Sequence, residues 1–352
     1  MRADRSSAPG MAGLNPAGHL VALVVTCNRL AKLKVALDQC RRQGFDHVVV
    51  VNTGPWIEPE ACGFPTDGSS ALTPRFELLQ LNENVGGAGG FQIGLAHIYG
   101  LYRLGLLPRN SWCVLFDDDA YPEEGCLGTF RAHQDSYQSV AALAAAVVSP
   151  QGRAVEVNRP ILNVFRSAGR LKTVLSRGWP RSARDWYHVP TGLIEQPGAV
   201  CAVDAISFVG LFLNLALMPA HGWPLPDSRL FIYSDDTLFT WSLRRGGGQL
   251  LLVSSLRFVH DTATGYEAGL IRPVWKLFYL TRNSWQVYGQ LGGCVLGPVL
   301  FAIGLVQKLC TCVRYSDRQD RRQARRAIRF ALWDLCRHRR YRSFASLQAA
   351  LE

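Results

Sequence analysis

The chain has 352 residues, which is enough for one large domain or two domains of ordinary size. Hydrophobic residues make up 48% and charged residues 18%, a composition that allows a sizeable core and excludes wholesale disorder. Residues 307–345 hold twelve Lys and Arg against three Asp, so this segment carries most of the net charge of +11. The rest of the chain is nearly neutral, which argues against a uniformly basic nucleic-acid-binding protein.

The N-terminal segment and the cysteines indicate the cellular compartment of the protein. Residues 1–18 lack the apolar core of a signal peptide and are expected to form a disordered tail. The ten cysteines include no C-x-x-C pair, and several lie in apolar runs. They are therefore expected to be reduced, buried thiols in a cytoplasmic protein.

The first half of the chain alternates strand and helix patterns. The expected strands are 20–26, 47–51, 76–81 and 112–116, and the expected helices are 29–42 and 91–104, the second of them preceded by a glycine-rich turn at 84–90. This rhythm predicts an α/β fold with a doubly wound, mostly parallel sheet. Ligands of such sheets bind beyond the carboxyl ends of the strands, so Asn52, Asn84 and Asp117 are expected to share one crevice.

The second half is less regular. Residues 140–149 suit a helix or a strand equally, and 199–217 suit a strand and a turn followed by a strand or a helix. A helix with an acidic start is expected at 234–245, and residues 250–259 suit two strands or one bent strand. Three regions follow: the tail 1–18, a catalytic domain 19–275, and a helical C-terminal region 276–352 that is first apolar and then basic.

The strongest motif is Asp117-Asp118-Asp119, directly after the apolar strand WCVLF. Three acids at a strand end repel one another unless a cation joins them, and a hard divalent ion suits such a set. A solvated acidic turn is the alternative. Asp235-Asp236 opens an amphipathic helix, where one acid can cap the helix and one can act as a general base.

Two further features complete the candidate site. His260 follows a strand in RFVHD and could complete a metal shell as a neutral imidazole, although a lone His is commonly structural. The run NVGGAGGF fits neither G-x-G-x-x-G nor a P-loop. Its glycines allow a sugar or an anion to approach the backbone at a helix N-terminus, and tight packing of helix on strand is the alternative.

Taken together, these motifs resemble inverting glycosyltransferases of family 2 with the GT-A fold. The resemblance runs from about residue 21 to residue 284 and rests on VVTCNR, VVVVNTG, the glycine run, FDDDA, and SDD followed by His. NVGGAGGF, FDDDAYPEEG and TRNSW are more narrowly similar to galactofuranosyltransferases and related rhamnosyltransferases.

The resemblance implies a role for each matching residue. Asp236 would be the catalytic base and Asp235 its acidic neighbour, facing acceptor or donor sugar. Asp117, Asp119 and His260 would hold Mn²⁺ or Mg²⁺, with Asp119 the direct ligand of the two acids. The nucleotide sugar would meet Thr26, Asn28, Arg29, Asn52, Asn84, Gly86, Gly87, Gly89, Gly90, Asp117 and Asp118. At Asn52 the family usually has an Asp that contacts the base.

The implied activity is transfer of a galactofuranosyl residue from UDP-galactofuranose to a hydroxyl of a glycan or lipid-linked glycan, in the synthesis of a bacterial cell-surface polysaccharide. A rhamnosyltransferase that uses dTDP-rhamnose is the alternative enzyme. A non-catalytic carbohydrate-binding scaffold is the alternative of another class. Nucleic acid is not an expected partner, since no base-stacking motif accompanies the basic segment.

The C-terminal region predicts contact with a membrane. Residues 291–306 are apolar but number 16, fewer than the ~20 that span a bilayer. The helix expected at 318–335 has Ala324, Ala327, Ile328, Ala331 and Leu335 on one side with Arg residues beside them. Such a helix is typical of an anchor on an anionic membrane surface, here the inner face of the cytoplasmic membrane. A basic helix that packs on the catalytic domain is the alternative.

Overall fold

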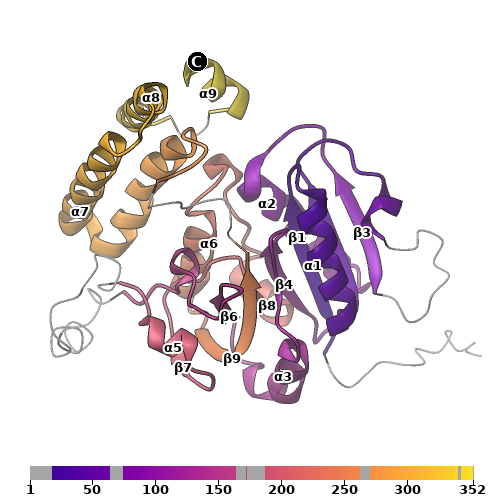
Figure 1. The fold of residues 1–352 in the computed structure, drawn as a ribbon. Helices are drawn as coiled ribbons and strands as arrows, with labels where there is room; N and C mark the ends of the chain where they lie inside the picture. The colour runs from indigo at the N-terminus through magenta and orange to yellow at the C-terminus, as the bar shows by residue number, and fades with distance from the viewer. Residues whose placement is uncertain are drawn as a thin grey trace, which may run out of the picture.

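A nine-stranded mixed sheet forms the centre of the protein (Figure 1). The computed structural model describes residues 18–63, 74–163, 172, 187–261, 270–339 and 342–351. The strand order is β3-β2-β1-β4-β8-β6-β9-β5, and β7 pairs with β9. The strands are β1 (Leu20–Thr26), β2 (His47–Asn52), β3 (Arg75–Gln80), β4 (Trp112–Asp117), β5 (Ala120–Pro122), β6 (Ala142–Val148), β7 (Val200–Ala202), β8 (Leu211–Asn214) and β9 (Leu250–His260).

The first four strands are parallel, and their register places polar residues at one edge. Thr26 pairs with Asn52, and Val25 pairs with Asp117. The strands themselves are runs of buried, largely β-branched residues, as expected for a sheet covered on both faces. Asn52 and Asp117 thus lie at the same, carboxyl edge of the sheet, as the strand pattern predicted, and the crevice expected to join them with Asn84 stays a prediction.

Helices cover both faces of the sheet. Successive side chains of β1 therefore point into different hydrophobic cores. Val21, Leu23 and Val25 belong to one core with α2 (Gly86–Arg103) and α6 (Asp235–Arg245). Leu20, Ala22 and Val24 belong to a second core with α1 (Leu30–Gln43) and α3 (Cys126–His133). The short helix α5 (Thr191–Glu195) lies near β6.

The second half of the sheet adds the antiparallel strand β8 between β4 and β6. β9 runs parallel to β6 and antiparallel to β5, and its register pairs His260 with Ala120. This pairing brings His260 beside the residue that precedes Ala120, which is Asp119. The mostly parallel sheet with helices on both faces and a helical C-terminal region confirms the predicted α/β fold.

Three expectations for individual elements are resolved by the structure. The glycine run is not a turn before a helix, because α2 already begins at Gly86 and contains the other glycines. Residues 142–148 form the strand β6, and residues 250–260 form one strand with an irregular register between Ala145 and Ala146 of its partner. The expected tail lies, apart from Gly18, outside the described residues.

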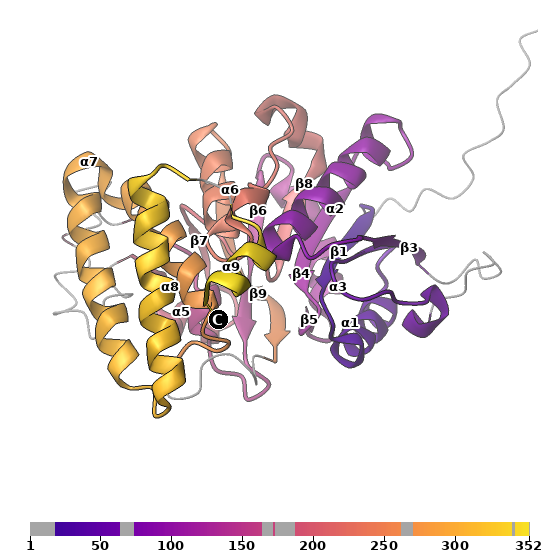
Figure 2. The same ribbon diagram turned by 90° about the horizontal axis from the view of Figure 1, so that it is seen from above.

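Three helices form the C-terminal region: α7 (Lys276–Val313), α8 (Arg318–Cys336) and α9 (Phe344–Leu351). α7 and α8 lie side by side at one end of the molecule (Figure 2). α7 is kinked at Gly293, whose φ is 64° and ψ is −158°. The expectation that α8 presents its apolar side to a membrane is wrong: Ala324, Ala327 and Ile328 are buried in a core shared with α7 and α9.

Candidate active site

Two acids and one histidine meet at the carboxyl edge of the sheet. Asp117 ends β4, Asp119 precedes β5, and His260 ends β9. Their ligand atoms lie within 4.8 Å of one another. Nε2 of His260 is 3.2 Å from Oδ1 of Asp119, and both residues are buried. The structure therefore brings together the three residues that the sequence proposed as metal ligands.

The orientation of the His260 ring suits metal binding through Nε2. Nδ1 of His260 lies 2.7 Å from Oδ1 of Asn158, which can only accept a hydrogen bond. Nδ2 of Asn158 in turn donates to Oγ of Ser207 over 3.1 Å, which fixes the amide. With an ion bound, a proton on Nδ1 would leave the Nε2 lone pair free to bind it. Outer-shell acceptors of this kind hold the ligand tautomer in histidine metal sites.

The charges of the cluster also favour a cation. Burial, and then the charge of Asp119, raise the pKa of Asp117 to about 7. Burial would raise the pKa of Asp119 as well, but His260 and Arg29 hold it below its ordinary value. Two carboxylates and a neutral imidazole suit Mn²⁺, and a divalent ion would offset the repulsion between the acids. The residues present therefore fit the expected metal.

Thr26 and Arg29 hold the acidic segment in place. Oγ1 of Thr26 donates to Asp118 over 2.6 Å, and Nη1 of Arg29 donates to Oδ2 of Asp119 over 2.6 Å. Asp118 also accepts from Nε of Arg29, so its carboxylate faces β1 and not the metal cluster. Burial raises the pKa of Asp118 to about 6. The Arg29 side chain is 42% exposed and lies at the mouth of the cluster.

Asn28 and Asn52 differ in exposure. Asn28 is exposed and has a left-handed backbone, with φ of 58°. Asn52 is fully buried; its Nδ2 donates to Oε1 of Gln80 over 2.8 Å, and its Oδ1 accepts from the amide of Gly54 over 2.9 Å. The amide of Asn52 thus shapes the loop after β2.

The glycines of α2 mostly serve close packing. A Cβ at Gly90 would lie 2.5 Å from Val25, and a Cβ at Gly89 would lie 2.6 Å from Val85. At Gly86, which has a positive φ of 70°, a Cβ would lie 2.1 Å from the carbonyl oxygen of Phe231.

Around a Cβ placed on Gly87 there is open space. Asn84, an exposed residue before α2, accepts a hydrogen bond from the amide of Gly86 over 2.9 Å. Of the four predicted glycines, Gly87 is thus the one with room for a ligand, and packing explains the other three.

Asp235 and Asp236 open α6, as predicted. Asp235 is buried, and its pKa is raised well above the ordinary value by burial, by Asp236 and by Asp117. The influence of Asp117 places Asp235 close to the acidic cluster. Asp236 accepts a hydrogen bond from the amide of Thr237, but burial dominates and raises its pKa too. A raised pKa makes a carboxylate a stronger base.

Two residues of this site were not foreseen from the sequence, Asn158 and Lys276. Lys276 begins α7, and burial lowers its pKa, as does the nearby charge of Arg29, while Asp117 and Asp119 oppose the shift. Lys276 and Arg29 thus provide two cationic groups beside the acids. No local pattern marks either Asn158 or Lys276, because each reaches the site only through the tertiary fold.

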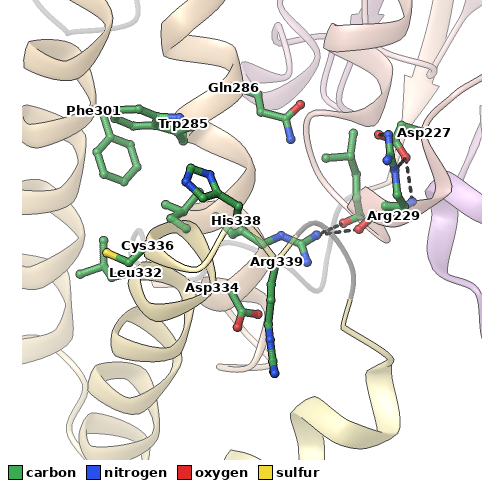
Figure 3. Close-up of a pocket in the computed structure, with 13 residues that line it drawn as sticks. Asp227, Arg229, Trp285, Gln286, Phe301, Leu332, Asp334, Cys336, His338 and Arg339 are labelled. Carbon is green, nitrogen blue, oxygen red and sulfur yellow. Dashed lines mark hydrogen bonds and ion pairs between the residues drawn. The ribbon is translucent and has the colours of Figure 1, made fainter.

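A cavity of about 560 Å³ lies apart from the acidic cluster (Figure 3). It lies between α7, α8 and the segment that carries Asp227 and Arg229. Trp285 and Phe301 of α7 contribute apolar surface, and Arg339 also lines it. None of the acids of the cluster lines this cavity.

The chain was also compared with known proteins. No family model matches the chain. Galactofuranosyltransferase GlfT1 of Mycolicibacterium smegmatis is 27% identical over 250 residues, which cover 69% of this chain and 71% of the relative. Galactofuranosyltransferase GlfT1 of Mycobacterium tuberculosis is 30% identical over 233 residues, or 64% of each chain.

Solved structures with a related arrangement share little sequence. S. aureus TarS 1–349 in complex with UDP has a TM-score of 0.48 and 13% identity, over 92% of this chain and 89% of that one. Mannosyltransferase PcManGT of Pyrobaculum calidifontis, in complex with GDP-Man and Mn²⁺, has a TM-score of 0.47 and 12% identity, over 95% and 84%. From its sequence relatives, the chain resembles galactofuranosyltransferases, and this similarity supports a glycosyltransferase.

Proposed function

We propose that the protein is an inverting, divalent-metal-dependent glycosyltransferase that transfers a galactofuranosyl residue from UDP-galactofuranose to a hydroxyl of a glycan or lipid-linked glycan. The product would belong to a bacterial cell-surface polysaccharide. One observation carries the proposal: the cluster of Asp117, Asp119 and His260 lies within electrostatic reach of Asp235, the residue next to Asp236. A site for a diphosphate and a site for a base thus adjoin.

The chemistry assigns a task to each group. A hydroxyl is a poor nucleophile at pH 7, so Asp236 would take its proton as the new bond forms. Arg29 and Lys276 would bind the diphosphate oxygens, which gain charge as the sugar leaves. Asp117, Asp119 and His260 would hold the divalent ion, whose chemistry is to offset that same charge. One base and no covalent sugar–enzyme intermediate give a single displacement with inversion.

The donor is inferred from the relatives, which are named galactofuranosyltransferases. The alternative donor is dTDP-rhamnose. A screen of both sugar nucleotides with purified protein and Mn²⁺, read as release of UDP or dTDP, tests the proposal. We expect turnover with UDP-galactofuranose and at least ~10-fold less with dTDP-rhamnose. The reverse preference would identify a rhamnosyltransferase, and UDP binding without turnover with any acceptor would favour the non-catalytic scaffold.

We further propose that the protein docks on an anionic membrane surface through α7. Because the apolar side of α8 is buried, the docking face must be another one. α7 is long and apolar enough to cross a membrane by length and composition, and 22% of its most apolar window is buried. Its exposed apolar residues recur every three or four positions, which places them on one side of the helix: Val295, Val299, Ile303, Val306, Leu309 and Val313.

The charges around this face match an anionic surface. Lys308 points inward, since its Nζ lies 3.3 Å from Oγ of Ser284, so it does not interrupt the apolar face. α8, packed beside α7, exposes Arg318, Arg322, Arg325 and Arg329. Each Arg near an anionic leaflet contributes about 1 kcal/mol to binding. Apolar surface with adjoining arginines is the composition of an interfacial membrane site, and a lipid-linked acceptor would place the reaction there.

Flotation with vesicles tests this docking face. We expect the full chain to float with phosphatidylglycerol vesicles at low salt and less with phosphatidylcholine vesicles. Val299→Glu with Ile303→Glu should abolish flotation. Val35→Glu, at an α1 residue that is 51% exposed as Val299 and Ile303 are, is the matched control and should float normally. Normal flotation of the α7 double variant would refute the proposal.

A further inference from the structure

The loop that precedes Asp235 has an unusual backbone. Phe231, Tyr233 and Ser234 all have positive φ, at 65°, 67° and 68°. None of them is glycine, so each pays a steric cost for this conformation. Such a loop keeps its shape only where its surroundings hold it. The loop leads directly into Asp235 and Asp236, so its shape sets where the two carboxylates lie.

One side chain of α7 binds this loop from inside the protein. Asn283 is fully buried, and its Nδ2 lies 3.0 Å from the carbonyl oxygen of Leu230 and 2.9 Å from those of Ile232 and Tyr233. An amide nitrogen carries two hydrogens, so the three carbonyls share two donors. The Asn283 amide thus binds the loop through its backbone.

The orientation of the Asn283 amide is itself fixed. Nε of Arg282 donates to its Oδ1 over 3.0 Å, so Nδ2 must face the loop. Nη2 of Arg282 donates to the carbonyl oxygens of Arg229 at 2.8 Å and Leu230 at 3.3 Å. The adjacent pair Arg282 and Asn283 therefore binds four of the five carbonyl oxygens from Arg229 to Tyr233, in the segment that leads into α6.

The other side of the loop is held by α2 and by aromatic stacking. The amide of Ala88 donates to the carbonyl oxygen of Phe231 over 3.0 Å, and Gly86 leaves the room for this approach. The Phe231 ring stacks on Tyr279 of α7, with centroids 4.8 Å apart and planes 18° apart. The loop is thus held between α2 and α7.

We propose that Asn283, oriented by Arg282, is a positioning residue of the transferase: it holds the Phe231–Ser234 loop in its left-handed conformation so that Asp235 and Asp236 face the acidic cluster. The expected effect on catalysis rests on the proposed function, whereas the effect on the conformation of the loop does not. Asparagine suits the task, because an Asp of the same shape would direct a carboxylate, without donors, at three carbonyl oxygens.

The test compares Asn283→Asp with a matched variant far from the site. Asn214 is also a buried Asn whose Nδ2 donates to backbone carbonyls, those of Gln138 and Val140, and it ends β8 beside Trp112. We expect Asn283→Asp to lower kcat at least ~10-fold with the donor KM changed less than about threefold. We expect Asn214→Asp to lower the Tm without changing kcat per folded molecule. A lowered Tm with unchanged kcat for Asn283→Asp would overturn the proposal.

A second measurement does not depend on activity. Hydrogen–deuterium exchange of the peptide that covers residues 228–238 should speed up in Asn283→Asp and not in Asn214→Asp. If Asn283→Asp does not fold, Arg282→Lys, which keeps the charge and loses the Nε donor, should show the same two effects more weakly. Unchanged exchange in the folded variants would refute the positioning role. Faster exchange in a protein that transfers no sugar would support the positioning role and refute the proposed function instead.

Discussion

Asp235 and Asp117 lie close enough for their charges to interact, although one begins α6 and the other ends β4. Burial and the adjacent Asp236 raise the pKa of Asp235, and the carboxylate of Asp117 raises it further. Burial raises the pKa of Asp117 as well, and repulsion from Asp119 raises it further. The site therefore gathers negative charge that the fold must tolerate, as expected where diphosphate and metal bind.

This repulsion predicts that Asp235→Asn stabilises the protein. When the pKa of a carboxyl is higher in the folded than in the unfolded protein, the protein keeps its full stability at low pH. It loses stability as the pH rises through the folded-state pKa. With chelator present, the Tm of the variant should exceed that of the wild type by a few degrees at pH 8, since each kcal/mol shifts the Tm of a large domain by about 2–4 °C. The gain should vanish near pH 4, and Asp38→Asn on the α1 surface should show none. A lower Tm at pH 8 would contradict the prediction.

Asn158 should tune the metal affinity through His260. Asn158→Leu removes the acceptor that keeps the proton on Nδ1, and loss of such an outer-shell group costs about 10–100-fold in metal affinity. Mn²⁺ binding followed by electron paramagnetic resonance measures this directly. Asn158→Asp keeps an acceptor at the same place and should bind Mn²⁺ nearly as the wild type does. Equal affinity in Asn158→Leu and the wild type would remove Asn158 from the site.

Lys276 should bind the diphosphate. Lys276→Gln removes a partly buried cation beside Asp117 and Asp119, and a hydrogen bond to a charged group contributes about 1.5–3 kcal/mol. The Kd for UDP, measured by calorimetry with Mn²⁺ present, should rise by at least ~10-fold. Lys34→Gln, on the exposed side of α1, changes the net charge equally and should leave the Kd unchanged. An unaltered Kd for Lys276→Gln would show that this cation does not contact the nucleotide.

Metal dependence gives a separate prediction. Excess chelator should abolish transfer by the wild type, and restored Mn²⁺ should recover it. Asp119→Ala should be inactive at any Mn²⁺ concentration, because Asp119 supplies a carboxylate between His260 and Arg29. Full activity in excess chelator would exclude the divalent ion from the mechanism.

The parallel half of the fold was predictable because its strands are continuous apolar runs, each ended by polar residues. The start of α2 was misplaced, because four glycines among the eight residues 84–91 oppose a helix locally. The contacts of Gly90 with Val25 and of Gly86 with Phe231 require small residues there, and these contacts are tertiary. β6 was ambiguous because alanine is common in helices, and only its pairing with β8 and β9 decides its conformation.

The candidate site was predictable where a motif is compact. Asp117, Asp119 and His260 do come together, whereas Asp118 and Arg29 pair with each other, which residue type alone could not indicate. Asn158 and Lys276 were missed because their roles arise from loops and helices that return to the site from distant parts of the chain.

The most direct test of the account is the turnover of Asp236→Asn. If Asp236 takes the proton of the acceptor hydroxyl, the variant should keep its affinity for UDP and lose turnover by at least ~10²-fold, the usual contribution of a general base. Asp235→Asn serves as the comparison, since it removes the neighbouring charge. Full turnover in Asp236→Asn, with Asp235→Asn inactive, would reverse the roles of the two acids, and full turnover in both would contradict the proposed mechanism.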